Sequence, residues 1–415
     1  MVETVRSLRA IALPAYGPTA LGSIGTGAVL PVVVLSARAM GAEVSLAAFL
    51  LSLTWIAQLA GDLPAGAIAG RIGERAALLV ACGVEALGMV GCALAPNLWV
   101  LGGSLCLLGA SASLFGLARQ AYLTDAVPVH LRARALSTLG GVGRIGIFIG
   151  PFVGALVVSR WGVSAAYLVG FVSSVAALVL VLLVPDITAE HRRAEAGMPR
   201  RSVAGVLGEH RRTLLTLGVG ALFIAGARAC RLALIPLFAE SIGLDAAHTS
   251  LVVGIAGAVD MLLFYPAGGV MDRFGRLWVA LPSMVVLAVG LALLPLAHSF
   301  ATLTAVAAVL GVGNGIGAGL VMTLGADAAP LDARVQFLGG WRLMADLGNA
   351  AGPAIVGAIT LVAPLGVAAV AMGVAALGGA GWLRLWVPRF DPVTRGRPRG
   401  APGDADATPG GPTPG

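Results

Sequence analysis

The sequence predicts an all-α membrane protein with twelve transmembrane helices, arranged as two six-helix repeats. Of its 415 residues, 58% are hydrophobic and only 11% are charged, whereas a soluble domain carries about 25% charged residues. In addition, motif residues recur at a constant offset of 202 positions, from Pro64 and Pro266 to Pro151 and Pro353. A repeat of this length organises a whole membrane fold, because each copy is one structural unit.

Twelve apolar runs are long enough to cross a bilayer, for which a helix needs about 20 residues. Glycine and proline are frequent within these runs, which membrane helices tolerate. We expect the first run to stay in the protein, since it is too long for a signal peptide and lacks a clear cleavage site. In chain order, the runs cover residues 14–36, 45–69, 77–96, 99–122, 136–158, 163–184, 214–238, 248–271, 278–297, 301–325, 337–361 and 364–387.

The runs divide the chain into two halves, a linker and a tail. We expect the N-terminal six-helix half over residues 1–185 and the C-terminal half over 214–390. The arginine-rich segment 186–213 between them predicts a cytoplasmic linker with a helix that lies on the membrane surface. In the segment 391–415, 12 of 25 residues are Pro or Gly, which predicts a disordered cytoplasmic tail.

The distribution of arginine predicts how the chain is oriented in the cell membrane. All 27 basic residues are arginine. If the N-terminus is cytoplasmic, 20 arginines lie in cytoplasmic segments or adjoining helix ends, and only Arg38 and Arg160 lie in outside loops. Because cytoplasmic loops are enriched in basic residues, this bias predicts that both termini are cytoplasmic. The same placement argues against nucleic-acid binding, despite the net charge of +7.

The sequence contains no pattern typical of an enzyme. It has no recognisable Ser/His/Asp set and no metal-ligand cluster, and its four cysteines lie inside apolar runs without a CxxC motif. The absence of lysine excludes a Walker-type phosphate loop, whose lysine contacts the nucleotide. We therefore expect neither catalytic activity nor a cofactor or metal.

A loop motif, G-x-x-x-D-R-x-G-R, occurs between the second and third runs of each half. The second copy is complete, whereas the first has Gly70 in place of Asp and Glu74 in place of the last basic residue. The glycines permit a tight turn and close packing. The arginines suggest two clamps, Arg71–Asp125 and Arg273–Asp327, although they could simply set the topology. The candidate gating residues are Gly66, Arg71, Gly73, Asp125, Arg132, Gly268, Asp272, Arg273, Gly275, Asp327 and Arg334.

A second repeated motif lies in the fifth run of each half. Its proline removes a backbone donor, which bends a helix. Its glycines form a small-xxx-small face that lets a neighbouring helix approach, either as an exporter feature or as ordinary packing. The motif residues are Gly146, Gly150, Pro151 and Gly154 in the first half, and Gly348, Gly352 and Pro353, with Gly357, in the second.

These motifs resemble the major facilitator superfamily along nearly the whole chain. The loop motif resembles the signature of that superfamily, and the motif of the fifth run resembles its drug/proton antiporter branch. Leu21-Gly22 followed by Leu30-Pro31 is loosely similar to the first-helix motif of that branch. The resemblance implies that helix 5 packs on helix 8, that helix 2 packs on helix 11, and that helix 7 lines a central cavity.

Charged residues inside the apolar runs are candidates for the transport pathway, because buried charges in membranes are costly and usually functional. Arg228 and Arg231 share one face of helix 7, which suits an anionic group or a network with a carboxylate. We expect pairs between Arg144 and Asp260 and between Asp62 and Arg342, which could also serve only to hold helices together. The charged candidates are Arg228, Arg231, Asp260, Arg144, Asp62, Arg342 and Asp346. The neutral Asn314 either adds a hydrogen bond in the cavity or serves helix packing.

The sequence therefore predicts a secondary active transporter that works by alternating access. We expect proton-coupled efflux of small amphipathic compounds, with Asp260, Asp62 or Asp346 taking up the proton. The alternative is an importer or facilitator of a small organic anion that Arg228 and Arg231 recognise, and a non-transporting receptor on the same fold is a third class. The expected partners are a small-molecule substrate, protons and the lipid bilayer, with no nucleic acid, and the expected state is a monomer.

Overall fold

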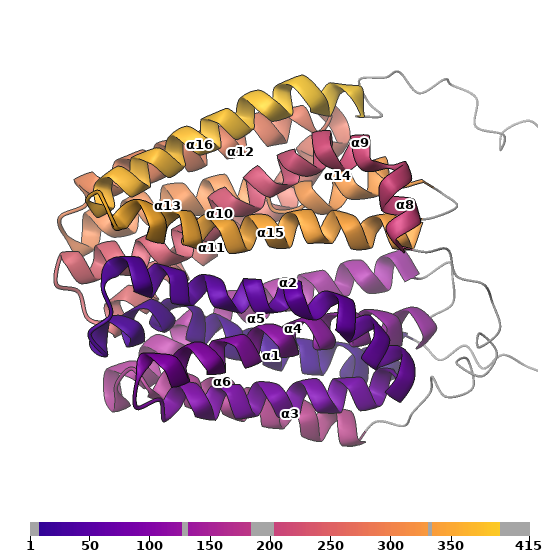
Figure 1. The fold of residues 1–415 in the computed structure, drawn as a ribbon, viewed down its shortest axis with the longest axis horizontal. Coiled ribbons are helices and arrows are strands. Elements are labelled where there is room, and N and C mark those ends of the chain that lie inside the picture. Colours follow the sequence, from indigo (N-terminus) through magenta and orange to yellow (C-terminus); the bar gives the residue numbers. More distant parts are fainter. Residues whose placement is uncertain (1–7, 127–131, 184–202, 331–333, 391–415) are drawn as a thin grey trace, which may run out of the picture.

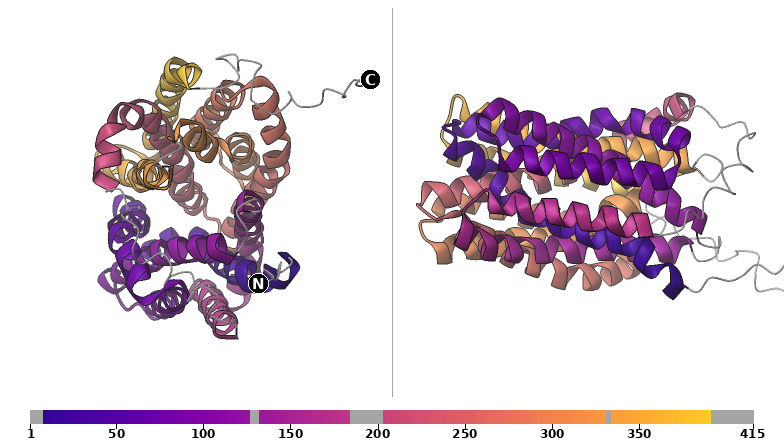
Figure 2. Two further views of the ribbon diagram at one scale, coloured as in Figure 1. Left: turned by 90° about the vertical axis from the view of Figure 1, so that its right-hand side faces the viewer. Right: turned by 90° about the horizontal axis from the view of Figure 1, so that it is seen from below.

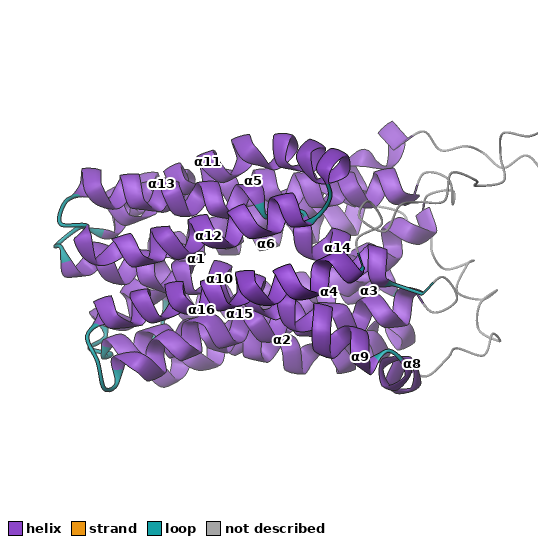
Figure 3. Cartoon of the chain, turned by 90° about the horizontal axis from the view of Figure 1, so that it is seen from above, coloured by secondary structure: helices purple, strands orange, loops and turns teal. Residues whose placement is uncertain are grey.

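The computed structural model describes residues 8–126, 132–183, 203–330 and 334–390. Within these ranges every regular element is a helix, and short loops join the helices (Figure 3). Helices up to α6 lie together on one side of the molecule, and α10 to α16 lie on the other (Figure 1). The fold is therefore all-helical and is built from two repeats, as predicted.

The helices of the first repeat run back and forth along the molecule. They are α1 (Leu8–Ala39), α2 (Val44–Ile72), α3 (Glu74–Ala93), α4 (Leu98–Ala126), α5 (Arg132–Trp161) and α6 (Ala165–Leu183). The second repeat follows two short helices, α8 (Val203–Glu209) and α9 (Arg211–Thr213), and a π-helical turn, η2 (Leu214–Gly218). Its elements are α10 (Val219–Ser241), α11 (Ala246–Phe274), α12 (Leu277–Leu293), η3 (Leu294–Leu296), α13 (Phe300–Ile316), α14 (Leu320–Ala328), α15 (Arg334–Thr360), α16 (Leu365–Trp386) and η4 (Val387–Arg389).

Eleven of the described helices or helix runs are long and apolar enough to cross a membrane. The expected span that is not among them corresponds to α15, which has 27 residues and carries Arg342, Asp346 and Asn349. These polar residues lower its hydropathy, but α15 packs between α2 and α10, so that its sides contact other helices. Eleven of the twelve predicted apolar spans are therefore found among the described residues. The exception is α15, whose polar side chains lie against other helices.

Two helix pairs hold the repeats together. α5 packs against α11, and α2 packs against α15. These are the contacts between helices 5 and 8 and between helices 2 and 11 that the resemblance implied. α1 and α10 also meet between the two repeats. The left view of Figure 2 looks along the helices, with the first repeat below and the second above.

Glycines with positive φ make the turns at both ends of the molecule. Gly73 (φ 90°) and Gly275 (φ 101°) lie in the α2–α3 and α11–α12 turns, at what we call the signature end. Gly41 (φ 86°) and Gly243 (φ 77°) lie in the α1–α2 and α10–α11 turns, at what we call the opposite end. Both pairs are 202 residues apart. Gly268, also expected to aid the turn and close packing, instead lies inside α11 with open space beside it.

The predicted linker and tail are described only in part. Residues 184–202 and 391–415 lie outside the described ranges. The described part of the linker includes α8, which packs on α15. Leu207 of α8 lies directly against Gly340 of α15. The short helix is thus attached to the second repeat.

The small-residue motif packs one helix onto another within each repeat. A Cβ atom on Gly146 or Gly154 would come within 3.0 Å of α1. Gly348 and Gly352 face α10 in the same way, whereas Gly357 faces α2. Gly357 thus also lets a helix approach closely, as expected, but that helix is α2, because Gly357 lies one position beyond the residue equivalent to Gly154. α5 and α15 both continue as helices through their prolines.

Candidate functional site

Three of the predicted pathway residues form a continuous hydrogen-bonded chain. The Nε–H of Arg228 on α10 donates to Oδ1 of Asn314 on α13 at 2.6 Å. The Nδ2 amide of Asn314 donates to Oδ2 of Asp260 on α11 at 2.5 Å. The structure thus joins an arginine and a carboxylate through one amide, and this link was not predicted.

The glycines beside Asn314 explain how α13 reaches both neighbouring helices. A Cβ atom on Gly315 would lie 2.6 Å from the carbonyl oxygen of Asp260, so only glycine permits this approach to α11. A Cβ atom on Gly313 would lie 2.8 Å from the backbone nitrogen of Leu287 on α12. Asn314 is consequently 1% exposed, and its amide is held beside Asp260.

Two buried atoms of this network have no hydrogen-bond partner among the described residues. They are Nε of Arg231 and Oδ1 of Asp260. Asp260 interacts electrostatically with Arg228 and Arg231, and also with Arg144. Because unpaired buried polar groups cost free energy, such atoms mark places where a proton, a water or a substrate group would be stabilised.

Arg144 extends from the first repeat into the second. Its Nη2 donates to the carbonyl oxygen of Ala318 at 2.6 Å, and its guanidinium lies 4.3 Å from the ring centre of Phe264. Ala318 lies in residues 317–319, where the helix is interrupted between α13 and α14. The expected Arg144–Asp260 pair is therefore an electrostatic contact, while the hydrogen bond of Arg144 goes to the interrupted helix.

A second polar cluster lies between α2, α4 and α15. The Ser113 hydroxyl donates to Oδ1 of Asp62 at 2.5 Å. Arg342 pairs with Asp346 one helical turn away, at 3.4 Å between Nε and Oδ2. The expected Asp62–Arg342 ion pair is therefore wrong: among the described residues Arg342 has Asp346 as its acidic partner, because the two share one face of α15.

The two clusters occupy equivalent places in the repeats. Gln58 of α2 is 3.5 Å from Asp346 across the interface, through Nε2 and Oδ1. Gln58 and Asp260 are 202 positions apart, as are Arg144 and Asp346. Each interface therefore uses the same two positions. The α2–α15 interface has an amide and a carboxylate there, whereas the α5–α11 interface has an arginine and a carboxylate.

Sequence reasoning missed several side chains of these clusters. Gln58 and Ser113 were not singled out, although the offset of 202 from Asp260 would have pointed to Gln58. Arg342 lies against Gly116 of α4, where a Cβ atom would come 3.1 Å from its Nη2. Arg119, one turn further along α4, interacts electrostatically with Arg342. No local signal in the sequence predicted these contacts of α4 with α15.

At the signature end, the acceptor Asp327 is paired with an arginine other than the predicted one. Arg276 donates from Nε to Oδ2 of Asp327 at 2.8 Å. Arg273 is exposed, and its guanidinium lies 5.4 Å from the ring centre of Phe274. The turn at Gly275 directs the last arginine of the motif, rather than the first, towards α14.

The first copy of this clamp is not described at the level of side chains. The side chains of Asp125, Arg132 and Arg334 lie outside the described residues, so Arg71–Asp125 remains a prediction. Arg71 itself is exposed, as is Asp272 in the second copy.

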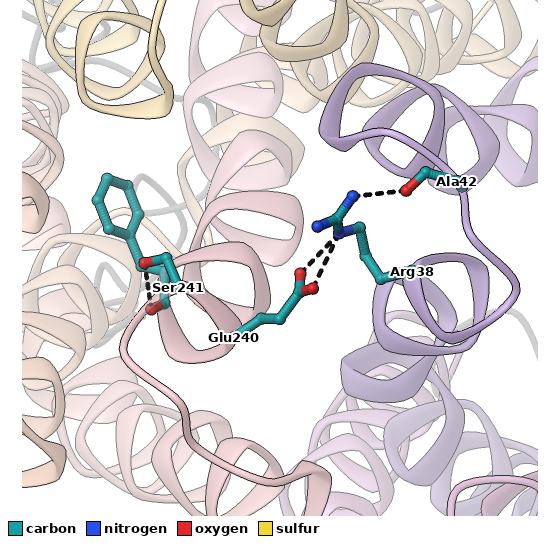
Figure 4. Close-up of polar contacts among 5 residues, drawn as sticks. Arg38, Ala42, Glu240 and Ser241 are labelled. Atoms are coloured by element: carbon teal, nitrogen blue, oxygen red, sulfur yellow. Dashed lines mark hydrogen bonds and ion pairs between the residues drawn. The ribbon is translucent and has the colours of Figure 1, made fainter.

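An ion pair links α1 and α10 at the opposite end of the molecule. Nε of Arg38, at the end of α1, lies 2.8 Å and 3.0 Å from the two carboxylate oxygens of Glu240 on α10, as Figure 4 shows. Nη1 of Arg38 also donates to the carbonyl oxygen of Ala42 at 2.5 Å. Arg38 and Glu240 are 202 positions apart, so equivalent residues of the two repeats pair with each other. The sequence predicts for Arg38 only a place in an outside loop, and does not predict this pair.

Any state in which the ends of α1 and α10 separate must break this pair. We expect Arg38→Glu and Glu240→Arg each to favour separation, because like charges then face each other, and the double exchange to restore closure. An ion pair between partly exposed charges contributes about 0.2–1 kcal/mol to the free energy of separating the two helix ends. Double electron–electron resonance between spin labels at the exposed positions 43 and 245, in a cysteine-free background, would measure the distances. A double exchange that opens as far as the single variants would contradict this prediction.

A family model and a solved structure both match this chain over most of its length. A family model described as Major Facilitator Superfamily matches residues 15–227 and 217–409. The inward-open conformation of the xylose transporter XylE from E. coli superposes with a TM-score of 0.71 at 17% identity, over 92% of this chain and 97% of that one. At that identity the likeness concerns the fold alone.

Three curated proteins match parts of the sequence. The inner membrane transport protein YajR of Escherichia coli is 26% identical over 208 residues, 49% of this chain and 45% of that protein. The multidrug resistance protein MdtG of Proteus mirabilis is 28% identical over 36% of this chain and 38% of its own length. The methylenomycin A resistance protein of Streptomyces coelicolor is 32% identical over 36% and 33%. The chain thus spans less than half the length of each relative that it matches.

Proposed function

Because the chain belongs to the Major Facilitator Superfamily and is a membrane transporter rather than an enzyme, we propose that it exports small amphipathic compounds in exchange for protons. The halves 1–185 and 214–390 rock about a polar site between them, in alternating access. The signature end faces the cytoplasm with both termini, and the protein works as a monomer in the cell membrane. The names of two relatives, a multidrug resistance protein and an antibiotic resistance protein, support export.

The observation that carries this proposal is the position of Asp260. Its carboxylate belongs to one repeat and interacts electrostatically with Arg144 of the other. Its Oδ1 atom is buried without a hydrogen-bond partner among the described residues, so this oxygen is the one that would accept a proton. Protonation would remove the negative charge and weaken the attraction between α11 and α5. A proton thereby shifts the equilibrium between states, as ligand-driven population shifts require.

The experiment uses purified protein in liposomes with a pH-sensitive dye inside. A thermal-shift screen of anionic and cationic compounds first supplies a substrate as the probe. We expect Asp260→Asn to lose at least tenfold of the transport driven by a proton gradient while retaining exchange of labelled for unlabelled substrate. Exchange persists because it requires substrate binding and reorientation but no net proton movement.

The matched control is Asp245→Asn on the same helix. Asp245 is the exposed N-cap of α11, and asparagine caps helices about equally well, so transport should stay at the wild-type level. Full proton-driven transport by Asp260→Asn would remove Asp260 from the proton role. Asp62 and Asp346 would then be the remaining carboxylates to test.

A second candidate function is import or facilitated diffusion of a small organic anion. The observation that favours it is the surplus of positive charge, because Arg144, Arg228 and Arg231 all interact with the single carboxylate of Asp260. The buried Nε of Arg231 lacks an acceptor among the described residues, and an anionic group would supply one. Anion uptake that survives collapse of the proton gradient and fails in Arg228→Ala would favour this function over export.

A further inference from the structure

The amide of Asn314 can adopt only one orientation in this network. An arginine guanidinium can only donate hydrogen bonds, so the group that faces Nε of Arg228 must be the amide oxygen. The NH2 group of Asn314 then faces Asp260 and must donate. The Oδ2 atom of Asp260 is therefore an acceptor, and a proton on this carboxyl group has to sit on Oδ1.

We propose that Asn314 is a positioning residue that transmits the charge state of Asp260 to Arg228. The inference rests on the proposed proton role of Asp260. When Asp260 is charged, the 2.5 Å bond from Asn314 is charge-assisted and holds the amide, which in turn holds Arg228. When a proton from the aqueous phase binds Oδ1, the bond to Oδ2 becomes a weaker neutral one. The amide loosens, and Arg228 is released from its fixed acceptor.

The surroundings of Asp260 leave few other routes for this signal. The charged groups that face it are Arg144 from α5 and both Arg228 and Arg231 from α10. α12 contains no charged residue, and those of α1 lie near its two ends. α13 contributes Asn314, which is the one group hydrogen-bonded to both a charged acid and a charged base in the described part of the network.

Release of Arg228 matters for exchange of substrate against protons. In the charged state of Asp260, Arg228 is tied to α13, and the substrate meets a fixed surface. After proton uptake the guanidinium is mobile and changes the charges that line the pathway. Proton binding and substrate binding therefore both act on Arg228. Binding of one lowers the affinity of the protein for the other.

Infrared spectroscopy of the full-length protein in lipid nanodiscs tests the first step. The carboxylic acid band of Asp260 is the part of the spectrum that disappears in Asp260→Asn. We expect this band to reach half its height at a higher pH in Asn314→Leu, by about one unit, which is a tenfold change in proton affinity. The reason is that leucine removes a donor that stabilises the charged carboxylate. Asn314→Ala gives the same comparison if leucine does not fold.

Nuclear magnetic resonance with 15N-arginine tests the second step. We expect the Nε–H signal of Arg228, assigned by its loss in Arg228→Gln, to broaden on acidification in the wild type. In Asn314→Leu the signal should already be broad and should no longer follow the protonation of Asp260. An Arg228 signal that still follows the Asp260 band in Asn314→Leu would overturn the proposal, as would an unchanged midpoint of that band.

The control for a general disturbance of α13 is Ser283→Ala. Ser283 donates to the carbonyl oxygen of Gly313 at 2.6 Å but has no bond to Asn314 or Asp260 among the described residues. This variant should lower the stability of the protein without changing the pH midpoint of the Asp260 band. If no carboxylic acid band that Asp260→Asn removes appears at any pH, Asp260 takes up no proton and its proposed proton role fails. If the pH midpoint of the Asp260 band is the same in Asn314→Leu as in the wild type, only the role of Asn314 is refuted.

Discussion

Replacement of Gly150 by alanine is expected to prevent stable packing of α5 on α1. A Cβ atom at this position would lie 2.5 Å from the carbonyl oxygen of Ile24 and 2.6 Å from the backbone nitrogen of Ala28. Both neighbours are backbone atoms of α1, so no side chain can rotate away. Overpacking of a close-packed interior costs about 1–3 kcal/mol and occasionally more. We expect the upper end here, because whole helices must shift.

The same helix supplies a control with the opposite sign. Gly141 of α5 has nothing within 4 Å of a Cβ atom. Gly141→Ala should therefore be neutral or stabilising, since alanine is the better helix former by up to about 1 kcal/mol. Size-exclusion chromatography and thermal unfolding in detergent would measure both variants. Equal behaviour of Gly150→Ala and Gly141→Ala would contradict the close approach of α5 and α1.

The second repeat allows an independent check of the same argument. A Cβ atom on Gly352 of α15 would lie 2.5 Å from the carbonyl oxygen of Gly226 on α10, whereas one on Gly339 would meet nothing within 4 Å. Gly352→Ala should destabilise the protein, and Gly339→Ala should not. Agreement between the repeats would show that the motif acts through backbone shape.

Loss of the Arg276–Asp327 ion pair is expected to cause the next largest loss of stability. Arg276 is 9% exposed and joins the α11–α12 turn to α14 through Asp327. It also donates from Nη1 to the carbonyl oxygen of Met271, near the end of α11. Arg276→Gln leaves Asp327 without this charged donor. Hydrogen bonds to charged groups contribute roughly 1.5–3 kcal/mol, and the partial exposure of Asp327 places the expected cost near the lower value.

Arg273→Gln is the matched control, because Arg273 is three residues away and exposed. Its removal should change the midpoint of thermal unfolding by much less. The double variant Arg276→Gln/Asp327→Asn should be no less stable than Arg276→Gln alone, since the unpaired carboxylate is then gone. A larger effect of Arg273→Gln than of Arg276→Gln would mean that the loop motif uses its first arginine after all.

The repeat predicts which residues occupy equivalent positions, but it does not predict which charged residues pair with each other. The offset of 202 correctly placed Gly73 and Gly275 at equivalent turns with positive φ. It also marked Arg144 and Asp346 as equivalent, and both lie at interfaces between the repeats. It did not reveal that Arg342 pairs along its own helix or that Asp327 selects Arg276. Those choices depend on how far each helix is rotated about its axis.

Residue identity alone determined the class of this protein, because a long apolar run has few stable places other than a bilayer, and because duplicated motifs at one spacing imply duplicated units. Only the tertiary structure decided which polar groups meet. Asp260 reaches Asn314 because Gly315 lets two backbones touch, and Arg38 reaches Glu240 because the ends of α1 and α10 converge. Such contacts join residues 54 and 202 positions apart, and their geometry depends on the tilt and rotation of whole helices.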